Sequence, residues 1–164
     1  MTAKLPLIRP ALLLAACWLS ALPAWSAPVS FRSGDGEIAM EELPYREAQA
    51  CKSAQCRAMH YAILGTERPK TVLSSLTVRR HGRVYRLPTD GMVDPQLGWK
   101  TSSRLALACD EADNCTVRGV FGDGGATYAA EWIIQNGRAT RTVFSTSMDL
   151  NGFIGEHLQA PTYR

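Results

Sequence analysis

The sequence has very little of what catalytic and metal sites usually need. Its three histidines are scattered, and none stands in the H-x3-H or H-E-x2-H spacing that indicates a metal site. No G-x-S-x-G motif occurs, so the pattern of the serine hydrolases is absent. Aromatic residues make up 8% and charged residues 20% of the chain, which is an ordinary globular composition. We therefore predict no catalytic residue, no metal and no cofactor, and a protein that is not an enzyme.

A long apolar run is missing everywhere except near the N-terminus. Lys4 and Arg9 precede an apolar stretch over 10–25 that ends in small residues, which is typical of a secretory signal peptide. Cleavage after Ser26 satisfies the small-residue rule best. The stretch is too short and too interrupted by proline for a membrane span. We expect a signal peptide over 1–26, a single domain over 27–164, and a periplasmic or secreted location.

One alternative concerns the same segment. The run Leu14-Ala15-Ala16-Cys17 resembles the lipobox of bacterial lipoproteins, in which the cysteine becomes the lipidated N-terminus. The protein would then be an outer-membrane lipoprotein anchored through Cys17. Apart from such an anchor, neither a membrane nor a nucleic acid is expected as a partner. The formal net charge is only +3, and two of these charges lie in the predicted signal peptide.

Four cysteines remain once Cys17 is set aside. An even number in an exported chain predicts two disulfides, with three possible connectivities. We favour the two local pairs, Cys51–Cys56 and Cys109–Cys115, and cross-pairing is the main alternative. Zinc is disfavoured because neither spacing is C-x2-C.

The stretch 127–145 gives the clearest indication of the fold. It is rich in β-branched and aromatic residues, and its centre, Asn136-Gly137, suits a two-residue type I′ turn. The register that follows from this turn pairs Ile134 with Ala139, Trp132 with Arg141, Ala130 with Val143, Glu131 with Thr142 and Tyr128 with Ser145. The predicted core face carries Tyr128, Ala130, Trp132, Ile134, Ala139 and Val143.

A coarse reading of the rest predicts a mainly β fold, either an antiparallel meander or a small β-sandwich with one or two short helices. Short connections between strands indicate antiparallel neighbours. In the first half we expect an irregular start over 27–36, a strand or helix start over 37–43, a short helix or a compact loop within 45–55, a strand over 57–64 and a hairpin over 74–87. In the second half we expect a long loop over 88–103 anchored by Trp99, strands over 105–109 and 115–121, and a helix over 147–158.

The hairpin over 74–87 is the most distinctive candidate site. It turns at His81-Gly82 and places Arg80 opposite Arg83, a like-charge pair that costs stability unless a carboxylate or another anion lies beside it. The functional interpretation is a site for a protein with an acidic surface, and the alternative is a solvated tip. If the arginines bind an acidic partner, substitution of both Arg80 and Arg83 by alanine should weaken that binding and leave the fold unharmed or slightly more stable, because a like-charge pair is removed. The candidate partner-binding residues here are Arg79, Arg80, Arg83, Tyr85 and Arg86.

A second candidate surface is the glycine-rich loop that begins at Gly122. Its segment Gly124-Gly125-Ala126-Thr127-Tyr128 resembles the Ser-Gly-x-x-Tyr loop of periplasmic lysozyme inhibitors, although Gly124 stands in place of the serine and the match covers five residues. Those proteins are small, exported, rich in β structure and disulfide-bonded. The resemblance adds Gly124, Gly125 and Tyr128 to the candidate partner-binding residues.

These features together predict an exported binding or inhibitor-type protein of the bacterial envelope. It would act through protein–protein contact, and a cell-wall hydrolase is one possible target. The alternatives are an envelope enzyme or assembly factor with an unrecognised site, in which His60 or Glu131 would be the residue to test, and the lipoprotein anchored through Cys17.

Overall fold

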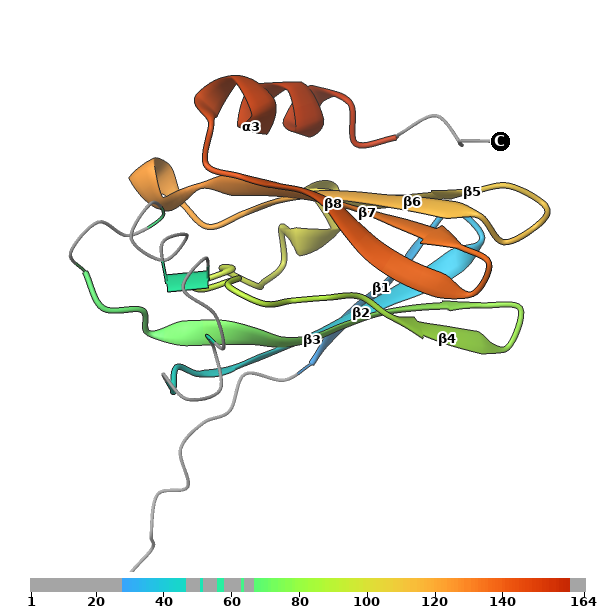
Figure 1. Ribbon diagram of the computed structural model, residues 1–164, viewed down its shortest axis with the longest axis horizontal. Coiled ribbons are helices and arrows are strands. Elements are labelled where there is room, and N and C mark those ends of the chain that lie inside the picture. Colours follow the sequence, from blue (N-terminus) through green and yellow to red (C-terminus); the bar gives the residue numbers. More distant parts are fainter. Residues whose placement is uncertain (1–27, 47–50, 52–55, 58–62, 64–66, 160–164) are drawn as a thin grey trace, which may run out of the picture.

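Eight strands form two antiparallel four-stranded sheets in a computed structural model that describes residues 28–46, 51, 56–57, 63 and 67–159. The first sheet has the order β1-β2-β3-β4 and the second the order β5-β6-β7-β8, so each sheet is a meander of consecutive strands (Figure 1). The predicted mainly β fold is therefore confirmed. The strand bounds are β1 Val29–Ser33, β2 Gly36–Pro44, β3 Thr71–Arg80, β4 Arg83–Arg86, β5 Leu105–Cys109, β6 Cys115–Phe121, β7 Tyr128–Gln135 and β8 Arg138–Ser145.

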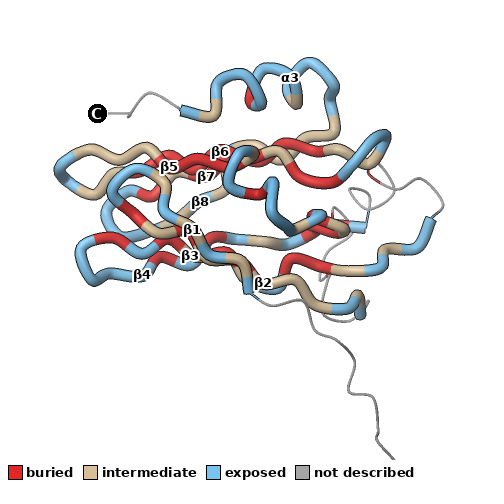
Figure 2. Tube along the Cα trace, turned by 180° about the vertical axis from the view of Figure 1, so that it is seen from behind, coloured by how far each residue is buried: buried red, intermediate tan, exposed pale blue. Residues whose placement is uncertain are grey.

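The hydrophobic core lies between the two sheets (Figure 2). Alternate residues along the strands face inward, and β6 and β7 are buried on both faces. Ile38 and Val78 from the first sheet and Val117 and Trp132 from the second sheet are completely buried. The second sheet is also covered on its outer side by α3, Met148–Glu156, which packs on β6 and β7 through the buried Ile154 (Figure 1).

The β7–β8 hairpin confirms the predicted turn and corrects part of its register. Asn136 and Gly137 have φ of 52° and 77°, and the pairs nearest the turn are those expected. A β-bulge then shifts the register by one residue at Thr142, whose hydroxyl donates hydrogen bonds to the carbonyl oxygen and the side chain of Glu131. As a result Phe144, rather than Val143, packs against the core. The corrected pairs are Glu131 with Val143, Ala130 with Phe144 and Ala129 with Ser145.

The first sheet contains a strand that sequence reasoning missed. The segment over 27–36 was expected to be irregular, yet β1 pairs with β2 across a two-residue turn at Gly34-Asp35. The signal was present, since Phe31 alternates with polar neighbours before a Gly-Asp-Gly turn. The short strand over 105–109, its partner over 115–121 and the helix following Ser147 all agree with the sequence-based expectations.

Two expectations fall on or near segments that are only partly described. The predicted signal peptide, most of the helix or loop expected within 45–55, and His60 lie outside the described residues. The strand expected over 57–64 is wrong where it can be checked, because Arg57 and Ile63 have helical backbone. In a short apolar run, periodicity alone does not separate a helix from a strand.

The cysteines form the two local pairs. The sulfur atoms of Cys51 and Cys56 lie 2.15 Å apart, and those of Cys109 and Cys115 lie 2.07 Å apart. Cys109 and Cys115 are direct partners in the β5–β6 ladder, so their bond closes the loop between these strands. No helix in the described part of the chain is long and apolar enough to cross a membrane.

Candidate functional site

The arginine hairpin forms as expected from β3 and β4. Its two turn residues have positive φ, and Arg80 pairs with Arg83 across the strands. The five candidate residues of this hairpin nevertheless divide into two groups by exposure. Arg79, Arg83 and Arg86 are exposed, whereas Arg80 and Tyr85 are buried.

The Arg80 side chain is only 4% exposed, because three turns enclose its guanidinium. Its Nε donates to Asp35 Oδ2 at 2.9 Å and its Nη2 donates to the same oxygen at 2.5 Å. Its Nη1 donates to Asp113 Oδ1 at 2.5 Å and to the Asp110 carbonyl oxygen at 2.7 Å. These bonds join the β3–β4 turn to the β1–β2 turn and the β5–β6 loop. Arg80 therefore acts within the fold and is not exposed to a partner.

Carboxylates also lie close to the exposed arginines of the same hairpin. Arg79 Nε is 3.8 Å from Glu37 Oε2, and Arg83 Nη1 is 4.0 Å from Asp113 Oδ2. Such exposed pairs contribute little to stability, but they reduce the positive potential of the surface. The end of the sandwich is thus a mixture of both charges rather than a basic patch, and an acidic partner at Arg83 and Arg86 stays a prediction.

The Gly124–Tyr128 segment presents only part of the surface expected from its resemblance. Gly124 and Gly125 are exposed in the short 3-10 helix η2, Gly124–Ala126, where the Asp123 side chain accepts a hydrogen bond from the Gly124 N–H at 2.9 Å. Tyr128 instead points into the core, where its ring stacks on Phe121 with centroids 5.6 Å apart. Burial raises the pKa of the Tyr128 phenol well above its usual value. The exposed glycines and not the tyrosine are available to a partner.

An open depression of about 460 Å³ lies beside these glycines and reaches the start of α3. Its lining residues are Gly124, Gly125, Thr127, Thr146, Met148 and Asn151. The Asn151 Nδ2 donates to the Thr127 carbonyl oxygen at 3.0 Å and so holds the helix against the loop.

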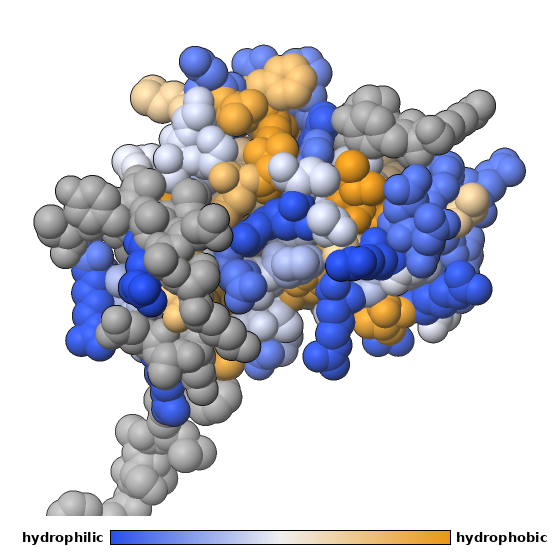
Figure 3. Space-filling view, viewed as in Figure 1, coloured by the Kyte–Doolittle hydropathy of each residue, from blue (hydrophilic) through white to orange (hydrophobic). Residues whose placement is uncertain are grey.

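The neighbouring helix exposes an unusual amount of apolar surface. Met148, Leu150 and Phe153 of α3 are three of the five exposed large apolar side chains in the described residues, and Met148 is 86% exposed. Hydrophobic atoms are visible along the outer side of the helix and beneath it in Figure 3. Apolar surface gathered on one element is typical of a contact site.

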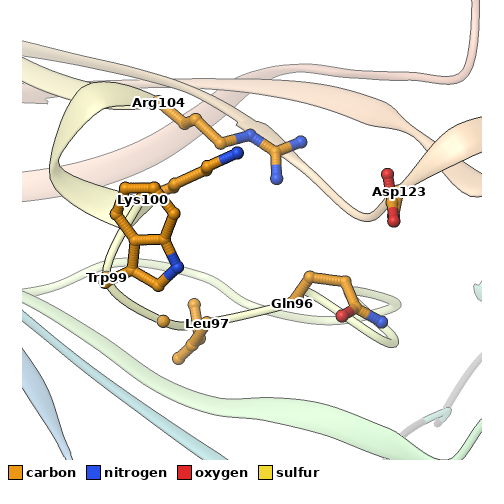
Figure 4. A pocket seen from close by; sticks show the side chains of 7 residues that line it. Gln96, Leu97, Trp99, Lys100, Arg104 and Asp123 are labelled. Atoms are coloured by element: carbon orange, nitrogen blue, oxygen red, sulfur yellow. The ribbon is translucent and has the colours of Figure 1, made fainter.

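A second open depression, of about 610 Å³, lies beside Asp123 in the Gly122–Tyr128 loop and shares no lining residue with the first. Trp99, which was expected to anchor the long loop over 88–103, is instead 87% exposed and forms one wall of this depression. Figure 4 shows Lys100 and Arg104 extending across the opening on the side of Trp99, with Asp123 facing them. The full set of lining residues is Gln96, Leu97, Gly98, Trp99, Lys100, Arg104 and Asp123.

Sequence reasoning missed this second depression because its residues come from separate segments. The Gly122 N–H donates to the Pro95 carbonyl oxygen at 3.2 Å, and Arg104 Nη2 donates to the Gly122 carbonyl oxygen at 2.8 Å. These contacts bring Asp123 beside the loop that carries Trp99. The single available signal was the position of Trp99 and Lys100 directly after Gly98, in a long loop of the kind that often carries function.

Glu131 and the two described histidines make contacts within the fold. Glu131 Oε2 accepts a hydrogen bond from Arg118 Nε at 2.6 Å beneath α3, and both side chains are buried. His81 Nδ1 is 3.0 Å from Asp113 Oδ1 at the hairpin tip, and His157 follows the last turn of α3. Within the described residues, no three His, Cys, Asp or Glu side chains are placed to hold a metal ion.

The geometry therefore singles out two depressions that share the Gly122–Tyr128 loop as a common border. Comparisons of the chain with models of known protein families, with curated proteins and with solved structures found no match.

Proposed function

We propose that this protein is an exported binding protein of inhibitor type that acts through protein–protein contact against a cell-wall hydrolase. The contact surface that we assign to this function consists of Gly124, Gly125 and the start of α3 at Met148, which line one depression. We call it the helix surface and define it by Gly124, Gly125 and Met148.

The observation that carries the proposal is the exposure of Met148, at the start of α3, beside an open depression. Met148 gains almost nothing from burial within the fold, since it is 86% exposed, whereas contact with a partner would remove its surface from water. Apolar anchors beside a concave, backbone-lined surface are the usual centre of a protein interface. The resemblance of the bordering loop to that of the lysozyme inhibitors supports a hydrolase as the partner.

The surface can be tested by filling the depression without disturbing the fold. A Cβ at Gly125 would meet nothing within 4 Å, and the residue does not have positive φ. We therefore expect Gly125→Arg to fold normally and to block the depression. Inhibition of lysozyme-type hydrolases acting on labelled cell walls is the measurement, with Gln135→Arg at the exposed tip of the β7–β8 hairpin as the matched control.

The expected outcome is inhibition by the wild-type protein and by Gln135→Arg, with a loss of about tenfold or more in affinity for Gly125→Arg and for Met148→Asp. If the wild-type protein neither binds nor inhibits any hydrolase of a broad panel, the proposed function is wrong. If Gly125→Arg inhibits as well as the wild type, the partner contact lies elsewhere on the molecule.

Export is part of the proposal and has its own test. Two disulfides are in keeping with an oxidising compartment, where such bonds persist. The intact mass of protein recovered from the periplasm should match a chain that begins at Ala27. A lipidated chain that begins at Cys17 would instead establish the lipoprotein alternative.

A further inference from the structure

We propose that the depression formed by Trp99, Lys100, Arg104 and Asp123 is a binding site for a carboxylated carbohydrate. This inference goes beyond the proposed function and does not depend on it, because the depression shares no lining residue with the one at the helix surface. We call it the tryptophan site.

The first argument is the position of Trp99. A tryptophan side chain carries one of the largest apolar surfaces in proteins, and its burial is usually among the strongest contributions to a core. Trp99 contributes almost no buried surface to the fold, since it is 87% exposed, whereas Trp132 is completely buried. Lys100 Nζ lies 4.8 Å from the centroid of the Trp99 ring and covers part of one face. The remaining indole surface is available to a flat ligand with an apolar face.

The second argument is that the loop holding Trp99 is rigidly built. The Gly98 N–H donates to Thr101 Oγ1 at 2.8 Å, and the Thr101 N–H donates back to the Gly98 carbonyl oxygen at 3.0 Å. Ser103 Oγ donates to the Lys100 carbonyl oxygen at 2.8 Å, and Thr101 itself is buried. These bonds close the short 3-10 helix η1, Thr101–Ser103, directly after Trp99. The exposed indole therefore stands on a fixed turn, which lowers the ordering cost of binding.

The third argument is the charge around the opening. Neither Lys100 nor Arg104 lies within salt-bridge distance of a carboxylate of the described residues. One hydrogen bond from Arg104 Nη2 to the Gly122 carbonyl oxygen fixes the guanidinium, and its other N–H groups stay available. Two unpaired cations at one opening favour a ligand with a negative group, and the geometry of a guanidinium suits a carboxylate.

The fourth argument separates a carbohydrate from other anions. Asp123 stands opposite the cations in Figure 4 and uses Oδ1 as acceptor for the Gly124 N–H, which leaves Oδ2 to accept from a hydroxyl group. Gln96 lines the same opening and can donate or accept. A carboxylate at the rim accepts hydrogen bonds from hydroxyl groups, which a sugar ring offers at several positions. A sugar ring with one carboxylate matches every group, with its C–H face on Trp99, its carboxylate at Lys100 and Arg104, and its hydroxyls at Asp123 and Gln96.

The volume agrees with this assignment. A depression of about 610 Å³ lies within the range of about 300–1,000 Å³ that is typical of small-ligand sites. The depression is open to solvent, so a chain of several sugars can extend beyond it while one ring contacts Trp99.

The test is calorimetric titration of the protein with three kinds of probe. Oligogalacturonides supply the carboxylated sugar, chitooligosaccharides supply a neutral sugar, and poly-glutamate and a single-stranded oligonucleotide supply other polyanions. Tryptophan fluorescence is followed in parallel, because Trp99 is exposed while the Trp132 indole is buried and its Nε1 donates to the Pro88 carbonyl oxygen. A signal that disappears in Trp99→Phe is then assigned to Trp99.

We expect oligogalacturonides to bind and to change the Trp99 emission. Trp99→Ala should weaken binding by about tenfold or more. Lys100→Met should weaken it several-fold and reduce its salt dependence, and Lys100→Arg should restore it. Lys70→Met is the matched control, because Lys70 is an exposed lysine that does not line the opening.

Three results would overturn the assignment. Binding of no carbohydrate probe excludes the site. Equal binding of neutral and carboxylated sugars, unaffected by Lys100→Met, removes the requirement for a negative group. Binding of poly-glutamate or the oligonucleotide in preference to oligogalacturonides, with the same dependence on Trp99, gives the site to a different class of ligand. Gly125→Arg should leave sugar binding unchanged, so failure here is distinguishable from failure of the proposed function.

Discussion

Replacing Arg80 by methionine removes the guanidinium that joins three turns at one end of the sandwich. Methionine keeps most of the apolar stem and its volume, so the change isolates the polar contacts. The four hydrogen bonds to Asp35, Asp113 and the Asp110 carbonyl oxygen are lost together. The sequence alone favoured the opposite expectation, since it placed Arg80 in a like-charge pair whose removal leaves the fold unharmed.

The magnitude follows from how the two carboxylates are exposed. Removal of one partner from a buried ion pair costs about 3–5 kcal/mol, because the other charge stays buried without compensation. Asp113 is only 14% exposed and meets this condition, whereas Asp35 is 56% exposed and can be hydrated. We therefore expect a loss of about 3 kcal/mol in the free energy of unfolding, which corresponds to a decrease of about 10 °C in Tm. Urea unfolding followed by fluorescence measures it.

The matched control is Arg83→Met in the same hairpin. The Arg83 side chain is 73% exposed and stands 4.0 Å from Asp113, so its loss should change the free energy of unfolding by about 0.5 kcal/mol or less. Arg80→Lys should fall between the two, because an ammonium group cannot reach both carboxylates with the geometry of a guanidinium. If Arg80→Met and Arg83→Met unfold at the same urea concentration, Arg80 does not hold the three turns together and the reasoning is refuted.

Three further predictions concern the fold. Acid should weaken it. Hydrogen bonds from Arg80 lower the pKa of Asp35, and those from Asn114 lower the pKa of Asp110, below the usual 3.8. These carboxylates therefore contribute fully to the free energy of unfolding above pH 3.8, and the contribution is lost as the pH falls through their lower pKa values in the folded state. In Asp35→Asn, the urea concentration at the unfolding midpoint should depend less on pH over that range. Gly122→Ala should destabilise the protein by about 2 kcal/mol or more, because φ is +77° and the new Cβ would lie 2.3 Å from the Ala126 carbonyl oxygen; calorimetric melting that finds no loss would contradict the loop geometry. Peptide mapping without reduction should recover only the two local disulfides, and any cross-paired peptide would contradict the observed pairing. Loss of the Cys109–Cys115 bond should lower the free energy of unfolding by about 2 kcal/mol, from the entropy of the loop that it closes.

The candidate site could be predicted from the sequence only where its residues share one hairpin or one loop. The β3–β4 turn and its register follow from local preferences, so the neighbours of Arg80 on its own hairpin were correct. The carboxylates beside Arg80 come from residues that lie 45 and 33 positions away in the chain, and no local rule connects them. The same holds for Asp123 and Trp99, which come together only through the contact between Gly122 and Pro95.

By itself the sequence determined the strands over 105–109 and 115–121, the turns at 81–82 and 136–137, and the helix after Ser147, because turn chemistry and alternation are properties of neighbouring residues. It favoured the two local disulfides without excluding cross-pairing, and the structure decided for the local pairs. The tertiary structure decided the packing of the two sheets, the bulge at Thr142, the burial of Arg80 and the exposure of Trp99. Each of these depends on which distant side chain occupies the space beside a residue. Burial and ion pairing are set by that three-dimensional neighbourhood, and identical residue types in the chain are compatible with either outcome.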